Sequence, residues 1–568
     1  MTTGFRSGTI ITIISKLVWI ALVGIGSIFL SASHATAKSI QPNIILILTD
    51  DQTTESYDFL PFLQSIKKQA LILKQYYHSL SLCCPSRTSM LTGMYPHNHG
   101  VLNNHGKDGG YSKFESLGLE HKTWSKLLSD NGYKTAMLGK FLNGYPPGST
   151  YVPVGWSRWF VGYGNGQVAF NYSINSDGNV LGYGNGDRNY FTNVISDEAH
   201  KLIVQQPRDR RPLAILFSPH CPHLPSTPAF SYIGTYDDEP FVIHDKPSFN
   251  EADVSDKPAY IRALSLISSQ HITDMARHWR AGLECARSID DAFQRMWNDL
   301  KATGRLQNTY FFLTTDNGLM RGEHRIEGGK IVPYQESINS TLFVWGPGIV
   351  PGKDNRHLVA NIDFMPTFAQ LAGLRVPAWV DGRSLVPLFR AHHQTAPSPW
   401  RWFHIPSLAF PIERCAAADQ HPSPLGESLR HSADLLRSAH EVAAHAGEPA
   451  CRRRHLPHRL RNANDITWRK AFLVQGLAGS GGGGGDLIDD GQEFLTYVTG
   501  AYVYTKYAVS ADREFYDLIV DPYQLTNSWR ALPPRFVDEI EARIKDLYSC
   551  VGESCRIHEN SPSPSPSR

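Results

Sequence analysis

Acidic and amide side chains follow directly after two apolar runs of the sequence. Asp50 and Asp51 stand after the first of these runs, and Asp316 and Asn317 stand after the second. All four side chains offer oxygen ligands, which suit a hard cation such as Ca²⁺ or Mg²⁺ and not zinc. If the two pairs meet in the fold, we expect them to form a site for a divalent cation.

Basic side chains occupy similar positions after other apolar runs. Lys140 and His220 each follow such a run closely, and Lys330 comes later in the chain. These groups could neutralise an anionic substrate or transfer a proton. His223 lies near His220 in the sequence, but it could equally be a solvated loop residue. Together with a cation, this collection of side chains suits the hydrolysis of an anionic ester.

The apolar runs predict the scaffold that would hold these side chains. They cover residues 43–49, 134–138, 213–217 and 310–315. Each is apolar at nearly every position, a pattern typical of strands buried on both faces of a parallel sheet. Helical patterns at 122–131 and 276–301 indicate an α/β sheet with helices on both faces. Ligands bind at the carboxyl ends of strands in such sheets, so the polar residues should meet at one edge. For any single run, an ordinary turn or helix cap is the alternative.

The segment 81–93 contains two adjacent cysteines before a proline. Pro85 suits the first turn of a helix, and Cys83 stands just before it. The N-terminus of a helix favours a bound anion or a thiolate. The alternative interpretation of Cys83 and Cys84 is a buried cysteine pair or a disulfide site.

This segment resembles the signature of the type I, formylglycine-dependent sulfatases. The signature is Cys-x-Pro-Ser-Arg followed by Leu-Thr-Gly, and Cys84 takes its variable place. The resemblance covers most of residues 42–390 and returns around 466–556. The stretches 139–145 and 156–192 look like the N-acetylglucosamine-6-sulfatase and heparan endosulfatase branch. Leu142 departs from many sulfatases, which carry a histidine at this position, and that branch shares the departure.

The resemblance implies an alkaline-phosphatase-like α/β sandwich. Its catalytic domain would contain a large mixed, mainly parallel sheet, and a smaller C-terminal domain would contain an antiparallel sheet with a helix at 536–547. It also implies that a formylglycine-generating enzyme oxidises Cys83 to formylglycine. The metal ligands would be Asp50, Asp51, Asp316, Asn317 and the modified Cys83, around Ca²⁺ or, alternatively, Mg²⁺.

The resemblance also implies roles for the remaining site residues. Arg87, one helical turn after Cys83, would hold the hydrated aldehyde. Lys140 and Lys330 would bind the sulfate oxygens, and His220 would donate or accept a proton. His324 is a further candidate for substrate contact.

The implied activity is hydrolysis of sulfate monoesters. The expected substrates are sulfated carbohydrates of the 6-O-sulfated glucosamine type, or aryl sulfates. The aromatic stretch 156–192 could stack on sugar rings, or it could be ordinary aromatic packing. One alternative is a formylglycine-dependent phosphonate or phosphate monoester hydrolase. Another is an inactive secreted glycan-binding homologue, in which Cys83 stays a thiol.

Composition and chain ends complete the expectations. The 568 residues include 55 Lys and Arg against 53 Asp and Glu, a net charge of +2 that argues against a general nucleic-acid binder. Residues 1–37 resemble a signal peptide, with an uncleaved membrane anchor as the alternative. We expect cleavage, no stable membrane span, and a secreted or periplasmic location, with a lysosomal one also open.

The remaining segments define a predicted domain plan. We expect a catalytic domain at 40–390, a C-terminal subdomain at 466–556 and a disordered tail at 557–568. The segment 391–465 lacks Lys and holds nine of the 24 His, so it reads as an atypical insertion or as sequence from a shifted reading frame or an intron. Cys550 and Cys555 are the best candidate disulfide in an exported chain. Asn171 and Asn339 stand in glycosylation sequons.

Overall fold

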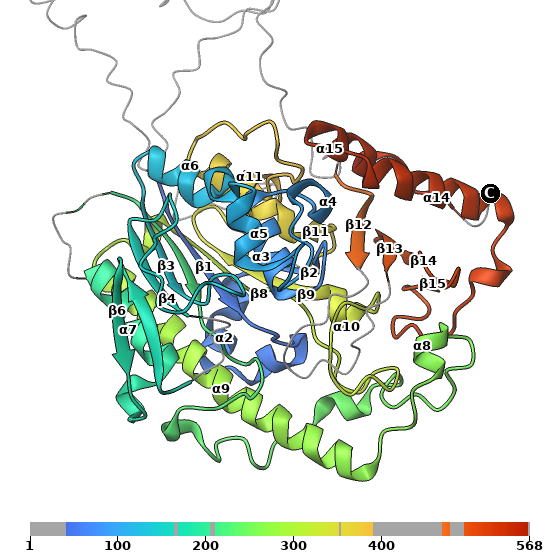
Figure 1. The fold of residues 1–568 in the computed structure, drawn as a ribbon, viewed down its shortest axis with the longest axis horizontal. Coiled ribbons are helices and arrows are strands. Elements are labelled where there is room, and N and C mark those ends of the chain that lie inside the picture. Colours follow the sequence, from blue (N-terminus) through green and yellow to red (C-terminus); the bar gives the residue numbers. More distant parts are fainter. Residues whose placement is uncertain are drawn as a thin grey trace, which may run out of the picture.

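A large mixed sheet forms the centre of the molecule (Figure 1). The computed structural model describes residues 41–163, 169–204, 209, 211–351, 354–389, 468–476 and 493–565. The predicted signal peptide and insertion lie outside these residues. In spatial order the strands are β10 (Asp354–Asn355), β2 (Leu71–Tyr77), β9 (Asn339–Trp345), β8 (Thr309–Thr315), β1 (Asn43–Thr49), β7 (Leu213–Ser218), β3 (Lys134–Gly139), β4 (Arg158–Gly162), β5 (Tyr172–Ser176) and β6 (Asn179–Tyr183). The short strand β11 (Val359–Ala360) also pairs with β2.

The four apolar runs form the adjacent strands β8, β1, β7 and β3, which are all parallel. In the register of this sheet, Leu46 of β1 lies between Leu216 of β7 and Phe312 of β8. The prediction of a parallel core is therefore confirmed. Strands β9, β5 and β6 run antiparallel to their neighbours, which makes the sheet mixed as expected.

Alternate residues of β1 enter two different cores, which places helices on both faces of the sheet. Leu46 packs with residues of α3, α6 and α11, whereas Ile45 packs with residues of α2, α7 and α9. The helices of this part of the chain are α2 (Pro61–Ile66), α3 (Cys83–Thr92), α4 (Pro96–His99), α5 (Gly110–Ser116), α6 (Trp124–Asp130), α7 (Phe191–Val204), α8 (Ala259–Arg262), α9 (Ser269–Ala302), α10 (Gln335–Ile338), α11 (Phe364–Leu371) and α12 (Val386–Phe389). Helices α6 and α9 confirm the two helices expected from the sequence.

A second, antiparallel sheet forms the C-terminal region. Its order is β12 (Ala471–Gly476), β13 (Phe494–Thr499), β14 (Tyr502–Tyr507) and β15 (Arg513–Asp517). Helix α14 (Pro534–Tyr548) packs on it through Phe536, Ile540, Ile544 and Leu547. Both the antiparallel sheet and its helix were expected.

The end of the chain is more ordered than the expected tail at 557–568. Helix α15 spans Glu553–Asn560, and its Glu559 is fully buried. The Glu559 carboxylate binds Arg469 at 2.9 Å and Arg383 at 2.6 Å, and it accepts a hydrogen bond from Tyr95. These buried charges hold the last helix against the catalytic region, so an ordered structure continues past residue 557.

Two disulfides are present among the described residues. Cys550–Cys555 confirms the predicted pair. Cys221–Cys285 was not predicted, and it joins the loop after β7 to α9.

In the described part of the chain, no helix combines the length and hydrophobicity needed to cross a membrane. Of the two sequon asparagines, Asn171 is exposed, whereas the Asn339 amide donates to the backbone of β2.

Candidate active site

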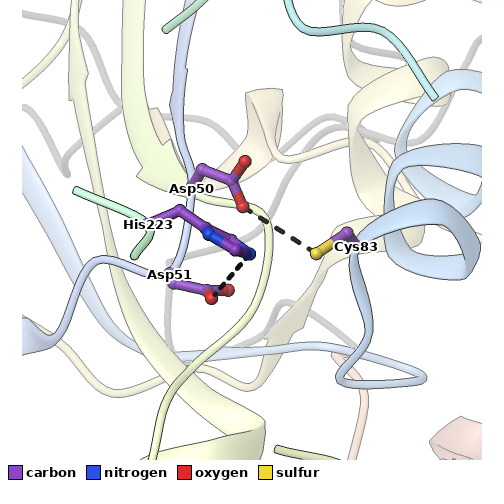
Figure 2. Close-up of side chains that lie close together, drawn as sticks. All are labelled: Asp50, Asp51, Cys83 and His223. Atoms are coloured by element: carbon purple, nitrogen blue, oxygen red, sulfur yellow. Dashed lines mark hydrogen bonds and ion pairs between the residues drawn. The ribbon is translucent and has the colours of Figure 1, made fainter. Parts of the chain in front are cut away.

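Four side chains from three elements converge at the carboxyl edge of the large sheet (Figure 2). They are Asp50 and Asp51 after β1, Cys83 at the start of α3 and His223 in the loop after β7. One potential ligand atom from each lies within 4.8 Å of the others. The predicted meeting of polar residues at this edge therefore occurs, with His223 as an added member.

Cys83 lies at the first turn of a helix that is buried along its whole length. Leu82, the residue before it, is extended and accepts a backbone hydrogen bond from Ser86. The helix ends at Gly93, whose φ of 72° a residue with a side chain rarely adopts. A Cβ at Gly93 would also lie 2.8 Å from the Met365 side chain. The local sequence therefore ends helix α3 sharply after Thr92.

The sulfur of Cys83 faces charged groups. It lies 3.8 Å from Oδ1 of Asp50 and 3.1 Å from Nζ of Lys330. Burial raises the pKa of the thiol to about 12, although Lys140 and Lys330 oppose the effect. Cys83 is thus placed next to both anionic and cationic partners.

Arg87 connects the ends of several strands. Its Nε donates to Oδ2 of Asp316 at 2.8 Å, and its Nη2 lies 3.6 Å from Oδ2 of Asp50. Nη1 donates to Oγ of Ser218 at 2.8 Å and to the backbone oxygen of Lys140 at 3.0 Å. Burial lowers the pKa of Arg87, but the two carboxylates outweigh this effect and raise it. Arg87 therefore stays charged and holds Asp50 and Asp316 in place.

Asp51 and Asn317 adjoin one another. The Asn317 amide donates to Oδ1 of Asp51 at 2.6 Å, and Lys330 binds the same oxygen at 2.6 Å. The backbone N–H of Asp51 donates to Oδ1 of Asp316 at 3.3 Å. Oδ1 of Asn317 is buried and has no hydrogen-bond partner among the described residues. This oxygen is an acceptor that a cation could satisfy.

The buried carboxylates differ in how the surrounding charges act on them. Burial would raise the pKa of Asp50, but Lys140 and His223 outweigh it and hold the pKa well below the usual range. Lys140 binds Oδ2 of Asp50 directly. For Asp316, burial and the neighbouring Asp50 raise the pKa despite Arg87. Asp50 is therefore strongly favoured as an anion.

Two histidines face the carboxylate pair. Nδ1 of His220 lies 3.3 Å from Oδ2 of Asp50, and Nε2 of His223 lies 3.5 Å from Oδ2 of Asp51. Burial lowers the pKa of His220 to about 4, and its Nε2 has no partner among the described residues. The sequence interpretation assigned proton transfer to His220 and left His223 open as a solvated loop residue. The three-residue spacing of the two histidines after a strand was the available signal for His223.

His324 contacts Glu251 and Tyr334. Its Nδ1 is 2.6 Å from Oε2 of Glu251, and its ring centroid is 4.1 Å from that of Tyr334. The side chain is completely buried. Its Nε2 is buried without a hydrogen-bond partner among the described residues, and its expected role in substrate contact stays a prediction.

Most of the described aromatic side chains in the stretch 156–192 pack inside the protein, whereas β6 and the loop after it are largely exposed. Trp159 has no exposed surface and Tyr190 retains 1%. Trp156 and Tyr163 are half-buried against the same core as Trp159. Ordinary aromatic packing, the alternative to sugar stacking, therefore accounts for the buried rings of this stretch.

The chain is similar to known sulfatases over most of its length. The family model described as Sulfatase matches residues 42–374. An arylsulfatase of Volvox carteri is 30% identical over 95% of this chain and 78% of its own length. N-acetylglucosamine-6-sulfatase of Homo sapiens is 28% identical over 91% of this chain and 86% of its own length. An extracellular sulfatase SULF-1 homologue of Drosophila melanogaster is 32% identical over 65% of this chain.

The extracellular sulfatase relatives are much longer than the matched region. The match covers 33% of the Drosophila melanogaster protein and 52% of a Sulf-1 homologue of Caenorhabditis elegans. Among solved structures, BT4656 in complex with its substrate D-glucosamine-2-N,6-O-disulfate superposes with a TM-score of 0.63 at 19% identity. That superposition covers 92% of this chain and 99% of the other, and it establishes the shared fold. Because the family model matches more than half of the chain and the arylsulfatase is 30% identical over most of both chains, this protein belongs to the sulfatase family.

Proposed function

We propose that this protein hydrolyses sulfate monoesters at Cys83. The observation that carries the proposal is the position of Cys83: its sulfur lies between Lys330 and Asp50 at the start of a buried helix. Helix N-termini and lysines attract anions, whereas the carboxylates would repel one unless a cation intervenes. The site therefore suits an anionic substrate together with a bound cation.

The donor set fits a hard divalent cation. Asp50, Asp51, Asp316 and Asn317 supply oxygens, and the buried Oδ1 of Asn317 has no other partner among the described residues. Ca²⁺, or Mg²⁺ as an alternative, would be held by these four residues and by the modified residue 83. When bound, such a cation polarises the sulfate oxygens and orients the ester.

We further propose that Cys83 is oxidised to formylglycine by a formylglycine-generating enzyme. The signature around Cys83 supports this modification. The hydrated aldehyde supplies two hydroxyl groups on one carbon, one to attack sulfur and one whose deprotonation releases sulfate.

The surrounding side chains would bind the substrate and move protons. Lys140 and Lys330 are buried beside Asp50 and Asp51, where they can bind sulfate oxygens. Neutral His220 directs Nδ1 at the Asp50 carboxylate, so its Nε2, which has no partner among the described residues, can accept a proton. His223 can protonate the departing alcohol oxygen. Arg87 maintains the geometry of the carboxylates through its contacts with Asp316 and Asp50.

For the substrate, we propose sulfated carbohydrate of the 6-O-sulfated glucosamine type. The similarity to N-acetylglucosamine-6-sulfatases across most of the chain supports this class, and the similarity to arylsulfatases keeps aryl sulfates as the alternative. The name of the extracellular relatives supports a secretory route and a secreted location. The expected signal peptide is consistent with this route, with periplasmic or lysosomal delivery as alternatives.

The decisive experiment combines mass spectrometry and kinetics on natively expressed protein. The tryptic peptide containing Cys83 should carry an aldehyde, and Cys83→Ala should abolish turnover. Cys84→Ala is the matched control, because Cys84 is an equally buried thiol on the same helix. It should keep both the aldehyde and the activity. Full activity of a chain that carries only a thiol at position 83 would contradict the proposal.

Matched substrates then separate the candidate activities. We expect kcat/KM for N-acetylglucosamine 6-sulfate to exceed that for 4-nitrophenyl sulfate. A ratio well below one would indicate an arylsulfatase. A phosphonate monoester hydrolase shares the fold with a TM-score of 0.56, so matched phosphate and phosphonate esters are included. Binding of sulfated glycans without any turnover would instead indicate the inactive glycan-binding homologue.

A further inference from the structure

Arg321 is a buried arginine without an anionic partner in the described part of the chain. It retains 8% of its surface, and its Nε is buried without a hydrogen-bond partner. Burying a guanidinium without a counter-charge is costly, so a folded protein normally pairs it. Arg321 is therefore positioned for an anion that the described residues do not supply.

The loop that carries Arg321 begins and ends at the active site. It runs from Asn317 to Lys330, and it is closed by a 2.9 Å hydrogen bond from the backbone of Met320 to that of Gly329. At Gly322, φ is 108° and an added Cβ would lie 2.3 Å from the Phe249 ring. The backbone next to Arg321 is consequently fixed, and the loop is anchored at both ends by site residues.

The carboxylates whose charges act on Arg321 already have other partners. Asp51, Glu323 and Glu55 are the acidic residues whose charges act on Arg321. Lys246 lies 2.8 Å from each of the two glutamates. Burial lowers the pKa of Arg321, and the three carboxylates offset this only in part. None of them forms an ion pair with the guanidinium among the described contacts.

We propose that Arg321 binds a second anionic group of the substrate while its sulfate ester lies at Cys83. A carboxylate or a further sulfate matches the planar fork of a guanidinium. The inference rests on the proposed function and adds, within that substrate class, a preference for glycans with at least two negative groups. Arg321 would then determine specificity and take no part in breaking the ester bond.

Binding can be measured without turnover in the full chain carrying Cys83→Ala. The probes are glucosamine 6-sulfate with a second sulfate on its nitrogen, and N-acetylglucosamine 6-sulfate, which lacks that charge. Calorimetry should show about tenfold or tighter binding of the doubly charged probe. Adding Arg321→Gln should bring the ratio of the two Kd values close to one, and Arg321→Lys should recover part of it. A 6-sulfated disaccharide with a uronic acid then distinguishes a carboxylate from a second sulfate.

Arg325 provides a matched control on the same loop. Its guanidinium donates to the backbone oxygens of Glu251, Leu264 and Ala252 at 2.8, 3.0 and 2.8 Å. Arg325→Gln should lower Tm and weaken both probes alike. Arg321→Gln should not lower Tm, because it removes an unpaired buried charge.

Three results would overturn the proposal. One is a doubly charged probe that binds no more tightly than the singly charged one to the chain that retains Arg321. Another is a Kd ratio that Arg321→Gln leaves unchanged. The third is a fall in Tm for Arg321→Gln as large as that for Arg325→Gln, which would make Arg321 structural. Hydrolysis of sulfate esters by the unsubstituted chain reports separately on the proposed function.

Discussion

Lys330 places its side-chain nitrogen 3.1 Å from the sulfur of Cys83, although 247 positions separate them in the sequence. The same nitrogen lies 2.6 Å from Oδ1 of Asp51. The Lys330 ammonium group lies between Cys83 and the Asp51 carboxylate, so it can exchange its contact with Asp51 for one with an anionic substrate. The relationship identifies Lys330 as a side chain positioned to bind developing negative charge.

Replacing Lys330 with Gln should therefore reduce kcat strongly. We expect a loss of about 10²–10³-fold, the range seen when one stabilising donor is removed from an active site. Steady-state kinetics with a sulfate ester provides the measurement. Lys257→Gln is the control, because Lys257 is equally buried but binds Glu251 and Asp256. The control should lower Tm and leave kcat nearly unchanged. If both variants lose the same activity, the role assigned to Lys330 is wrong.

Asn317→Ala should reduce the affinity for the divalent cation. Oδ1 of Asn317 is buried and accepts no hydrogen bond from the described residues. Removing this oxygen therefore removes a proposed cation ligand without breaking a hydrogen bond that the oxygen accepts. The unsubstituted protein should gain Tm when Ca²⁺ is added after chelation, because a ligand of the folded state stabilises it. In Asn317→Ala this gain should shrink at equal Ca²⁺ concentration. An unchanged dependence of Tm on Ca²⁺ would place the cation elsewhere.

The disulfide Cys221–Cys285 should affect both activity and stability. Cys221 lies between His220 and His223, and the bond attaches their loop to α9. Cys285→Ser should lower kcat/KM about tenfold through misplacement of the histidines, and it should cost about 2–4 kcal/mol of stability. Cys555→Ser breaks the other disulfide, in the C-terminal region, so it should lower Tm without changing kcat/KM. If the two variants have equal kcat/KM, the Cys221–Cys285 disulfide does not position His220 and His223.

Buried histidines should make the protein less stable in mild acid. Burial lowers the pKa of His78 to about 3, below the usual value of 6.5, so the unfolded chain takes up a proton that the folded chain resists. The stabilising contribution is complete above about pH 6.5 and is lost progressively as the pH falls toward 3. His78→Gln should reduce the slope of unfolding free energy against pH in this window by about 1 kcal/mol per pH unit. Urea titrations at pH 7, 6 and 5 measure it, and identical slopes would contradict the assignment.

Local patterns were sufficient to predict the core of the fold. The runs that became β1, β3, β7 and β8 are apolar at almost every position because both faces of these strands are covered. Their positions then predicted that Asp50 and Asp316 would meet, because parallel strands end at the same edge. The segment around Cys83 predicted its helix through the proline in the first turn.

Only the tertiary structure showed the contacts that depend on residues far apart in the chain. The sequence treated His220 as the proton-transfer residue, whereas the fold also brings His223 to Asp51. Nothing in the sequence indicated that Cys221 pairs with Cys285, and the packing of Trp159 in the core was only one of two open interpretations. Such contacts follow from strand register and helix packing, which combine many weak interactions across the chain. The sequence therefore predicted which chemical groups the site contains. Packing in three dimensions decided which partners these groups have, and it left Arg321 without an anionic partner among the described residues.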